Sequence, residues 1–305
     1  MPLLRARAKI TSHFYISTSA HLWLIPHSQN PRNSSLFLWF CSLGSAKPEP
    51  NLSANSAKLF LREPLTSEKR ADLMTDTVGN KWFCAELPVV DYRQILDLQR
   101  QLADARSNEV IDRDIVLLLE HSPVFTLGRR GGLESLKISR TLLEKSNIPI
   151  IQTERGGNIT FHGPGQLVVY PIIDLQAAGM QVLDYVASLE EIMIRVLADW
   201  GIFADRNPAN RGIWIGNSKI GSIGIAVRQG VCYHGFALNV DLALNPFGWI
   251  HPCGFKDIGV TSMQRELSES VSVNQVRGAI KRHLESYFGV ELISTTLPEL
   301  KNFIN

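Results

Sequence analysis

Residues 155–166, RGGNITFHGPGQ, place four glycines and a proline beside an arginine, a threonine and a histidine. Glycine lets a loop adopt positive φ and approach a ligand closely, so that backbone N–H groups can point at it. Such a loop could cradle a phosphate, line a narrow slot for an apolar or carbonyl-bearing chain with Arg155 and His162 at its mouth, or form a turn between strands. Neither GxGxxG nor a following Gly-Lys-Ser/Thr is present, so neither nucleotide fingerprint fits.

The second candidate for chemistry is Cys253, which stands between a proline and a glycine in HPCGFKDIGVTSM (251–263). This pattern predicts a thiol on a tight turn. A buried cysteine is usually an inert small hydrophobe, whereas a turn with Lys256 nearby favours reactivity. A thiolate nucleophile needs a pKa depressed by a neighbouring cation or a helix N-terminus. Cys84 and Cys232 lie in apolar surroundings, and we expect them in the core.

The third candidate is Lys219, in the apolar and small-residue stretch SKIGSIG (218–224). Desolvation lowers the pKa of a lysine and makes it a usable proton carrier near neutral pH. The alternative, which the residues alone favour, is a lysine whose stem lies on the surface with its ammonium group in water.

Histidines at 162, 234 and 251 are too far apart to imply a metal site, and no HExxH or CxxC accompanies them. We expect core histidines satisfied by hydrogen bonds. A Cys–His dyad of Cys253 with His162 or His234 stays open, as a thiol hydrolase would use.

Hydrophobic periodicity predicts the elements that position these residues. Helices are expected at 93–106, near 138–146, at 182–201 and at 273–288. Strands are expected within 114–128, broken at Ser122-Pro123, and at 148–153, 166–175, 211–227 and 231–240. The helix at 182–201 should bury a face made of Leu183, Val186, Leu189, Ile192, Val196 and Trp200. Because helices and strands mix without a regular βαβ alternation, we expect an α+β fold, a single domain with mixed or antiparallel sheets flanked by helices.

The 305-residue chain is 45% hydrophobic and 20% charged, which is typical of a globular protein. Its formal net charge of +2 hides an asymmetry: residues 1–73 hold nine Lys/Arg and four Asp/Glu, and the remainder holds 22 and 25. The acidic remainder gives no case for nucleic-acid binding. The apolar run at 36–44 is too short to span a bilayer, so no membrane association is expected.

The first residues differ from the rest of the chain. Residues 1–48 contain no acidic residue, many serines, and Arg5, Arg7 and Lys9, as transit peptides do. We expect 1–73 to be a disordered N-terminal extension, either transit-like or the result of a mis-assigned start, with translation then beginning at Met74. The expected compartment is the cytoplasm, or a mitochondrion or plastid if the extension is a genuine transit peptide. Four cysteines without a close pair are read as free thiols in a reducing compartment.

Several segments together resemble the lipoyl(octanoyl) transferases, a family that is similar in fold to the biotin and lipoate protein ligases. The segments are TLG (126–128), RGGNITFHGPGQLVVYPI (155–172), RGIWI (211–215), KIGSIG (219–224), HGFALNV (234–240), PCG (252–254) and VTSM (260–263). They run in the family's order and cover most of 82–265. The resemblance implies a biotin/lipoate protein ligase-like fold, with 74–305 as an octanoyltransferase catalytic domain.

The resemblance also implies a reaction. Octanoyl would pass from octanoyl-acyl carrier protein to Cys253 as a thioester, and then to a lysine of an apo lipoyl domain, the first step of lipoate attachment in endogenous lipoate biosynthesis. Lys219 would lower the pKa of the thiol and act as general acid and base. The acceptors would be the lipoyl domains of 2-oxoacid dehydrogenase complexes and the glycine cleavage H protein. No cofactor or metal is implied, and a monomer is expected.

The family's substrate-binding segments fall on three stretches of this sequence. The implied residues are Arg155, Gly156, Gly157, Asn158, Ile159, Thr160, Phe161, His162, Ser222, Ile223, Gly224, Gly235, Phe236 and Ala237. Three alternatives stay open: an ATP-dependent lipoate ligase of the same fold, a thiol hydrolase that releases free octanoate, and a non-catalytic binding module.

Overall fold

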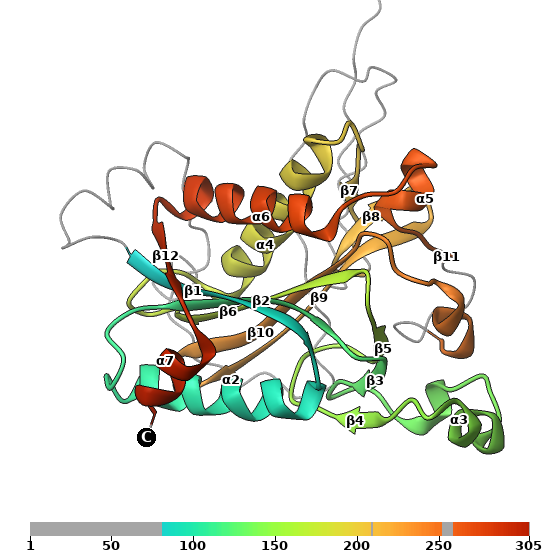
Figure 1. The fold of residues 1–305 in the computed structure, drawn as a ribbon, viewed down its shortest axis with the longest axis horizontal. Coiled ribbons are helices and arrows are strands. Elements are labelled where there is room, and N and C mark those ends of the chain that lie inside the picture. The colour runs from blue at the N-terminus through green and yellow to red at the C-terminus, as the bar shows by residue number, and fades with distance from the viewer. Residues whose placement is uncertain (1–80, 209, 252–258, 305) are drawn as a thin grey trace, which may run out of the picture. The chain divides into compact units, whose positions relative to one another are not determined.

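The computed structural model describes residues 81–208, 210–251 and 259–304. The expected extension at 1–73 and the expected nucleophile Cys253 therefore lie outside the described residues. The described chain begins with a strand, β1 (Lys81–Val90), and ends with a short helix, α7 (Leu297–Asn302), close to its C-terminus (Figure 1).

A large mixed sheet forms the centre of the described fold, in the order β12-β1-β2-β6-β10-β9-β8-β7, with β11 paired to β9. Its strands after β1 are β2 (Ile115–His121), β6 (Gln166–Asp174), β7 (Asp205–Arg206), β8 (Ile213–Ile215), β9 (Ser218–Arg228), β10 (Val231–Asn239), β11 (Gly259–Val260) and β12 (Glu291–Thr295). Strand β1 runs parallel to both β2 and β12, whereas β2, β6, β10, β9 and β8 pair antiparallel in turn. The expected α+β fold with mixed sheets is confirmed.

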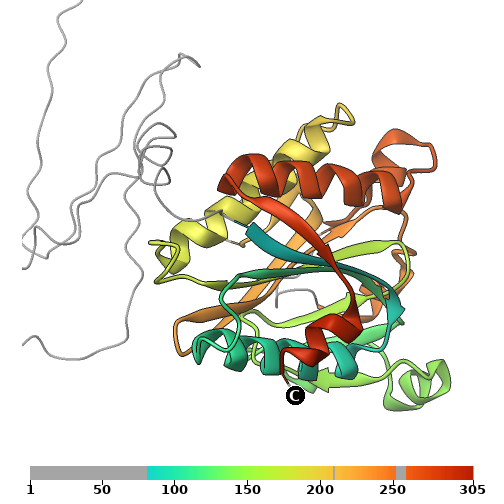
Figure 2. The ribbon, with the colours of Figure 1, turned by 60° about the vertical axis from the view of Figure 1, so that its left-hand side comes forward.

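Helices cover both faces of this sheet, as the two views show (Figures 1 and 2). Helices α4 (Val182–Ala198) and α6 (Val273–Phe288) pack on one face. Helix α2 (Tyr92–Ser107) and α7 pack on the other. Strand β2 is apolar from Ile115 to Leu119 because both of its faces are covered there. No helix in the described ranges is both long and apolar enough to cross a membrane.

A second, three-stranded sheet carries the glycine-rich loop. Its order is β4-β3-β5, with β3 (Val124–Leu127), β4 (Ile150–Gln152) and β5 (Ile159–His162). The short helices η2 (Leu133–Ser135), α3 (Arg140–Ser146) and η3 (Asn245–Trp249) connect these strands and the neighbouring segments, and α5 (Met263–Leu267) follows β11. Because β5 begins at Ile159, the loop at 155–158 is anchored at one end by this sheet.

The helix at 182–201 differs from expectation at its ends. The expected buried residues Val186, Leu189, Ile192 and Val196 are indeed buried. Leu183, in the first turn, is 69% exposed, and Trp200 lies beyond the end of α4 and is only partly buried. Helical spacing gives the direction in which a side chain points, but it does not tell how much of the helix the sheet covers.

Candidate active site

A cleft of about 530 Å³ opens between β9, β10 and the loop at 155–158. The predicted substrate-binding residues that line it are Arg155, Gly156, Gly157, Asn158, Ile159, Thr160, His162, Ser222, Ile223, Gly224, Gly235, Phe236 and Ala237. Lys219 lines the same cleft. Three segments far apart in the sequence therefore meet at one site.

Phe161 differs from its neighbours. Its ring packs against Phe125, at a centroid distance of 5.3 Å, and against Phe247, at 5.7 Å, in the apolar cluster of the small sheet. Successive strand residues point to opposite faces, so Thr160 and His162 face the cleft and Phe161 faces away. Its contribution is to hold β5 in place beneath the loop.

Arg155 is a buried clamp, which corrects the expectation that it lies at the mouth of the slot. Its side chain is 8% exposed. Nη2 donates to the carbonyl oxygen of Thr126 at 2.6 Å, and Nη1 donates to that of Gly156 at 3.0 Å. The guanidinium group therefore fixes the loop to β3.

Backbone hydrogen bonds also tie the loop at 155–158 to the segment after β3. The N–H groups of Gly128, Arg129 and Arg130 donate to the carbonyls of Asn158, Arg155 and Gly157, at 3.0, 3.0 and 3.1 Å. A Cβ atom on Gly128 would lie 2.5 Å from the carbonyl oxygen of Gly157. Glycine is thus required at 128 because the two segments approach so closely.

Gly224 and Gly235 have different reasons to be glycine. A Cβ atom on Gly224 would lie 3.1 Å from both the Gly156 carbonyl and the Arg155 side chain, so glycine lets the loop approach β9. A Cβ atom on Gly235 would lie 2.2 Å from the carbonyl oxygen of Val169, so glycine is needed by the β10–β6 pairing. Gly224 is therefore required by the shape of the cleft, and Gly235 by the pairing of strands in the sheet.

His162 is buried, and was also wrongly expected at the mouth. Its Nδ1 lies 2.7 Å from Gln166 Oε1, and the Gln166 amide donates to Asn239 Oδ1 at 2.9 Å. Asn239 Nδ2 in turn donates to the carbonyl of Thr261 at 2.9 Å. With each amide group oriented in this way, Nδ1 of His162 must carry the proton. Burial, the largest cause, lowers the pKa of His162 well below its usual value, so the ring is neutral.

Lys219 is also buried, with 6% of its surface exposed, so the surface-lysine alternative is excluded. Its Nζ donates to Asn210 Oδ1 and to the Arg211 carbonyl, both at 2.8 Å. It also stands 4.9 Å from the centre of the Trp214 ring. The β8–β9 register shifts between Ile213 and Trp214, beside Lys219, as at a β-bulge. Such an irregularity re-aims side chains along a strand.

The chain returns from the segment that contains Cys253 directly beside Lys219. Val260 of β11 is the register partner of Lys219, and Thr261 N–H donates to the Lys219 carbonyl at 3.0 Å. Cys253 precedes Gly259, the first residue of β11, by six positions in the sequence. The end of the segment that contains Cys253 therefore pairs with β9 at Lys219.

The described cysteines are poor nucleophile candidates. Cys84 and Cys232 are free thiols, and both are buried. Burial raises the pKa of Cys84 to about 11 and that of Cys232 to about 12. Neither thiol ionises near neutral pH, and the prediction that both lie in the core is confirmed.

His234 contradicts the expectation of a core histidine satisfied by hydrogen bonds. It lies within β10 with φ of +58°, a conformation that residues other than glycine rarely adopt. Neither ring nitrogen makes a hydrogen bond to the residues that the structure describes. The nearest carboxylate oxygen, Glu154 Oε2, is 3.8 Å from Nε2, which is too long for a hydrogen bond.

Tyr92, Arg130 and Asn210 also line the cleft, and none of them lies in a segment that the sequence singled out. Tyr170 and Arg211 line it too, and these lie within the segments 155–172 and 211–215. Within the described ranges, no group of three His, Cys, Asp or Glu side chains could hold a metal ion.

The comparisons with known proteins agree with this arrangement. Residues 91–285 match the family described as the lipoyl protein ligase A/B catalytic domain. The chain belongs to this family. The octanoyltransferase of Syntrophobacter fumaroxidans is 46% identical over 225 residues, which cover 74% of this chain and 98% of that protein. The octanoyltransferase of Desulfotalea psychrophila is 43% identical, over 72% of this chain and 99% of that protein.

Solved structures of lipoate protein ligases share the fold. A lipoate-protein ligase A bound with ATP gives a TM-score of 0.59 at 18% identity, and covers 74% of this chain and 92% of its own. A bi-partite lipoate protein ligase from Thermoplasma acidophilum gives 0.59 at 18% identity, over 73% and 90%. The resemblance to lipoyl(octanoyl) transferases with a lipoate protein ligase-like fold is confirmed.

Proposed function

We propose that this chain transfers an octanoyl group from an acyl carrier protein to a lysine of an apo lipoyl domain, through a thioester on Cys253. Relatives that are named octanoyltransferases match this chain over 98–99% of their own length. The similarity therefore covers all of the sequence that carries the activity in those relatives. The observation that carries the chemistry is Lys219, a buried lysine in a cleft beside the strand that returns from Cys253.

The proposed reaction has two acyl-transfer steps. In the first, the Cys253 thiolate attacks the carrier's thioester carbonyl, the carbon–sulfur bond to the carrier breaks, and the carrier thiol leaves with a proton. In the second, the acceptor amine attacks the new thioester, an amide forms, and the sulfur of Cys253 is released. The first step exchanges one thioester for another and needs no ATP. Amide formation drives the second.

Lys219 is suited to move the protons in both steps. Asn210 Oδ1 and the Arg211 carbonyl hold its Nζ in a single position. An ammonium group near Cys253 favours the thiolate and can give its proton to the carrier sulfur as it leaves; the neutral amine that results can then receive the proton that the acceptor amine must lose. The role assigned to Lys219 therefore requires both a fixed position and exclusion from bulk water.

The cleft suits a flexible apolar chain. Glycines at 156, 157 and 224 keep side chains out of the cleft where the loop meets β9. Burying an alkyl chain contributes about 0.8 kcal/mol for each methylene group. We infer that the acyl chain lies in this slot, with its carbonyl near Lys219.

Exposed arginines at the rim could guide the protein substrates. Arg129 and Arg130 follow β3 and are both exposed, and Arg130 lines the cleft. Acyl carrier and lipoyl domains are the general classes of donor and acceptor for this activity. If their docking surfaces are acidic, the two arginines would steer them despite the acidic body of the chain.

Leaving out one component at a time tests the proposed reaction. With octanoyl-carrier and apo lipoyl domain, we expect octanoyl-lysine to form without ATP. Free octanoate with ATP should give none, and an ATP-dependent product would support the ligase alternative instead. Without the acceptor domain, octanoate should not be released at a comparable rate; such release would support the thiol hydrolase.

For the domain limits and the compartment we keep the proposals made from the sequence. Residues 74–305 would form the catalytic domain, and the enzyme would work as a monomer in the cytoplasm. Sequencing the N-terminus of the mature protein tests the proposed start at residue 74. A mature protein that begins between residues 1 and 73 would contradict that start. Cell fractionation would test the compartment.

A further inference from the structure

Part of the cleft wall is formed by a histidine with an unusual backbone, His234. In β10, Cys232 and Phe236 face α4 and α6, and Tyr233 and Ala237 face α2. Regular alternation would direct His234 with the first pair. Instead its φ of +58° turns the ring against Tyr233, at a centroid distance of 4.9 Å, and against Tyr170, at 6.2 Å.

This backbone conformation is held from outside the sheet. The N–H of His234 donates to Oε1 of the fully buried Gln99, on α2, at 2.9 Å. A positive φ in a residue with a side chain is costly, and it persists only where the surroundings impose it. The strain thus keeps one imidazole ring, 1% exposed, as part of the cleft wall.

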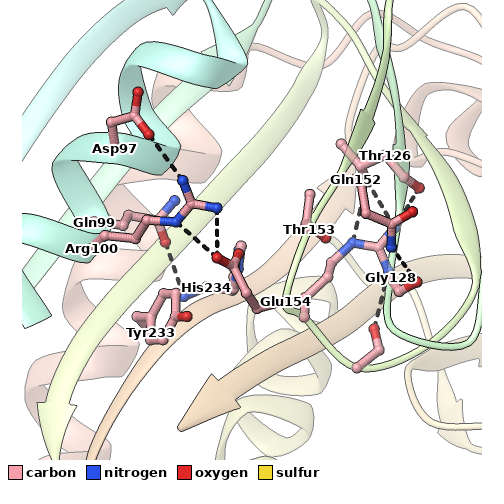
Figure 3. A network of polar contacts seen from close by, with 12 residues as sticks. Asp97, Gln99, Arg100, Thr126, Gly128, Gln152, Thr153, Glu154, Tyr233 and His234 are labelled. Atoms are coloured by element: carbon pink, nitrogen blue, oxygen red, sulfur yellow. Dashed lines mark hydrogen bonds and ion pairs between the residues drawn. The ribbon is translucent and has the colours of Figure 1, made fainter. Parts of the chain in front are cut away.

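An ion pair stands behind this ring on the solvent side. Arg100 Nε donates to Glu154 Oε1 at 2.8 Å, and Glu154 Oε2 is 3.8 Å from His234 Nε2 (Figure 3). The Arg100 and Glu154 side chains are 34% and 35% exposed, and neither lines the cleft. His234 therefore lies between the cleft and a pair of charged residues that contact solvent.

We propose that His234, supported by the Glu154–Arg100 pair, is the end wall of the acyl slot and sets the longest acyl chain that the enzyme accepts. This inference rests on the proposed function. The ring nitrogens have no hydrogen-bond partner among the residues that the structure describes, so the wall is polar as well as solid, and an apolar chain end gains little from packing against it. Chains too long for the slot meet both obstacles.

The length of β9 shows which chains reach the wall. Lys219 and Ile225 are on this strand, and Ile225 is the register partner of His234. Six residues of extended strand span about 20 Å at most. An extended chain advances about 1.2 Å per bond, so octanoyl covers about 8 Å and hexadecanoyl about 18 Å. Because 20 Å is the upper limit of this span, octanoyl ends well before the wall, whereas the end of hexadecanoyl comes close enough to contact it.

The test compares acyl-chain lengths within each variant. Wild type, His234→Gly and Cys232→Ala are given carrier protein loaded with octanoyl, dodecanoyl or hexadecanoyl, together with one apo lipoyl domain. Glycine suits the positive φ, so His234→Gly removes the ring without adding strain. We expect its hexadecanoyl-to-octanoyl rate ratio to rise about tenfold over wild type, the factor given by burying two more methylene groups.

The ratio is measured in one preparation, so it does not depend on how much of the variant is folded. Cys232→Ala, in the same strand but facing α4, should keep the wild-type ratio. If His234→Gly does not fold, Glu154→Ala is the deciding variant. Its hexadecanoyl-to-octanoyl rate ratio should rise less, because the ring of His234 is still present and only the residue behind it is lost. An unchanged ratio in the deciding variant, or an equal rise in Cys232→Ala, overturns the end wall. A wild-type protein that transfers no octanoyl would instead refute the proposed function.

Discussion

Lys219 is the residue on which the proposed chemistry depends. Lysine is almost never buried without partners, because its charged form is costly to remove from water. Here two oxygens accept hydrogen bonds from Nζ, and the Trp214 ring covers it. This arrangement keeps the amine in one place within a cleft, as a proton carrier requires and as a surface lysine does not.

Lys219→Met keeps the length of the side chain and removes its proton-carrying group. We expect the transfer rate to fall by a factor of about 100 to 10,000, the usual contribution of a positioned acid or base. Lys281→Met is the matched control, since Lys281 pairs with Glu86 on the outside of α6 and should leave the rate unchanged. Wild-type turnover in Lys219→Met, with folding verified by circular dichroism, would remove this role.

The sequence indicated some of the site residues and not others. Lys219 could be found because a charged residue in an apolar strand is unusual, and the glycine loop because of its composition. His234 was indicated only as a possible partner of Cys253; its strained backbone in the cleft wall could not be predicted, because a positive φ within a strand leaves no trace in the pattern of residue types. The burial of Arg155 was also hidden, since its partner Thr126 is 29 residues away.

At the scale of elements, the contact between β10 and β6 allows no side chain at position 235. Glycine at this point lets the Val169 carbonyl approach β10 while Phe236 and Ala237 line the cleft. The long elements followed from periodicity, as with α2, α4 and α6. The parallel pairing of β1 with β12 could not be predicted from periodicity, because it joins residues 81 and 291 and depends on the whole fold.

Gly235→Ala should destabilise the protein, because its Cβ would lie 2.2 Å from the Val169 carbonyl oxygen, a backbone atom that cannot move alone. Forcing an extra group into a packed interior costs about 1–3 kcal/mol, or more where backbone must shift. Gly248→Ala is the control, since no atom lies within 4 Å of its Cβ position. Urea unfolding measures both, and equal stability of the two variants would contradict the contact.

For the whole molecule, buried neutral histidines predict sensitivity to acid. Burial lowers the pKa of His121 to about 4, and also lowers the pKa values of His162 and His234. The unfolded chain binds protons at these sites below about pH 6.5, and the folded protein does so only at lower pH. Their contribution to stability is therefore complete above pH 6.5 and is lost as the pH falls toward 4.

Urea unfolding at pH 7.5 and pH 4.5 tests this dependence. The free energy of unfolding of wild type should be lower at pH 4.5, with His121 alone contributing at most about 3 kcal/mol. His121→Gln removes one of the titrating groups, so the difference between the two pH values should be smaller in this variant. An identical difference in both proteins would show that His121 does not titrate as proposed.

Ionic strength tests the role of the arginines at the rim. If Arg129 and Arg130 steer acidic substrates, the transfer rate at low substrate concentration should fall as salt is raised from about 0.01 M to 0.15 M, where the screening length shortens from about 30 to 8 Å. The double variant Arg129→Gln, Arg130→Gln should be slower at low salt and less sensitive to salt. A rate that is independent of salt in wild type would exclude steering.

The most direct test of the central claim is the intact mass of the protein after incubation with octanoyl-carrier and no acceptor. We predict that wild type gains one octanoyl group, that the adduct disappears when apo lipoyl domain is added, and that Cys253→Ala gains none. An octanoyl adduct on Cys253→Ala, or full transfer by that variant, would contradict the account.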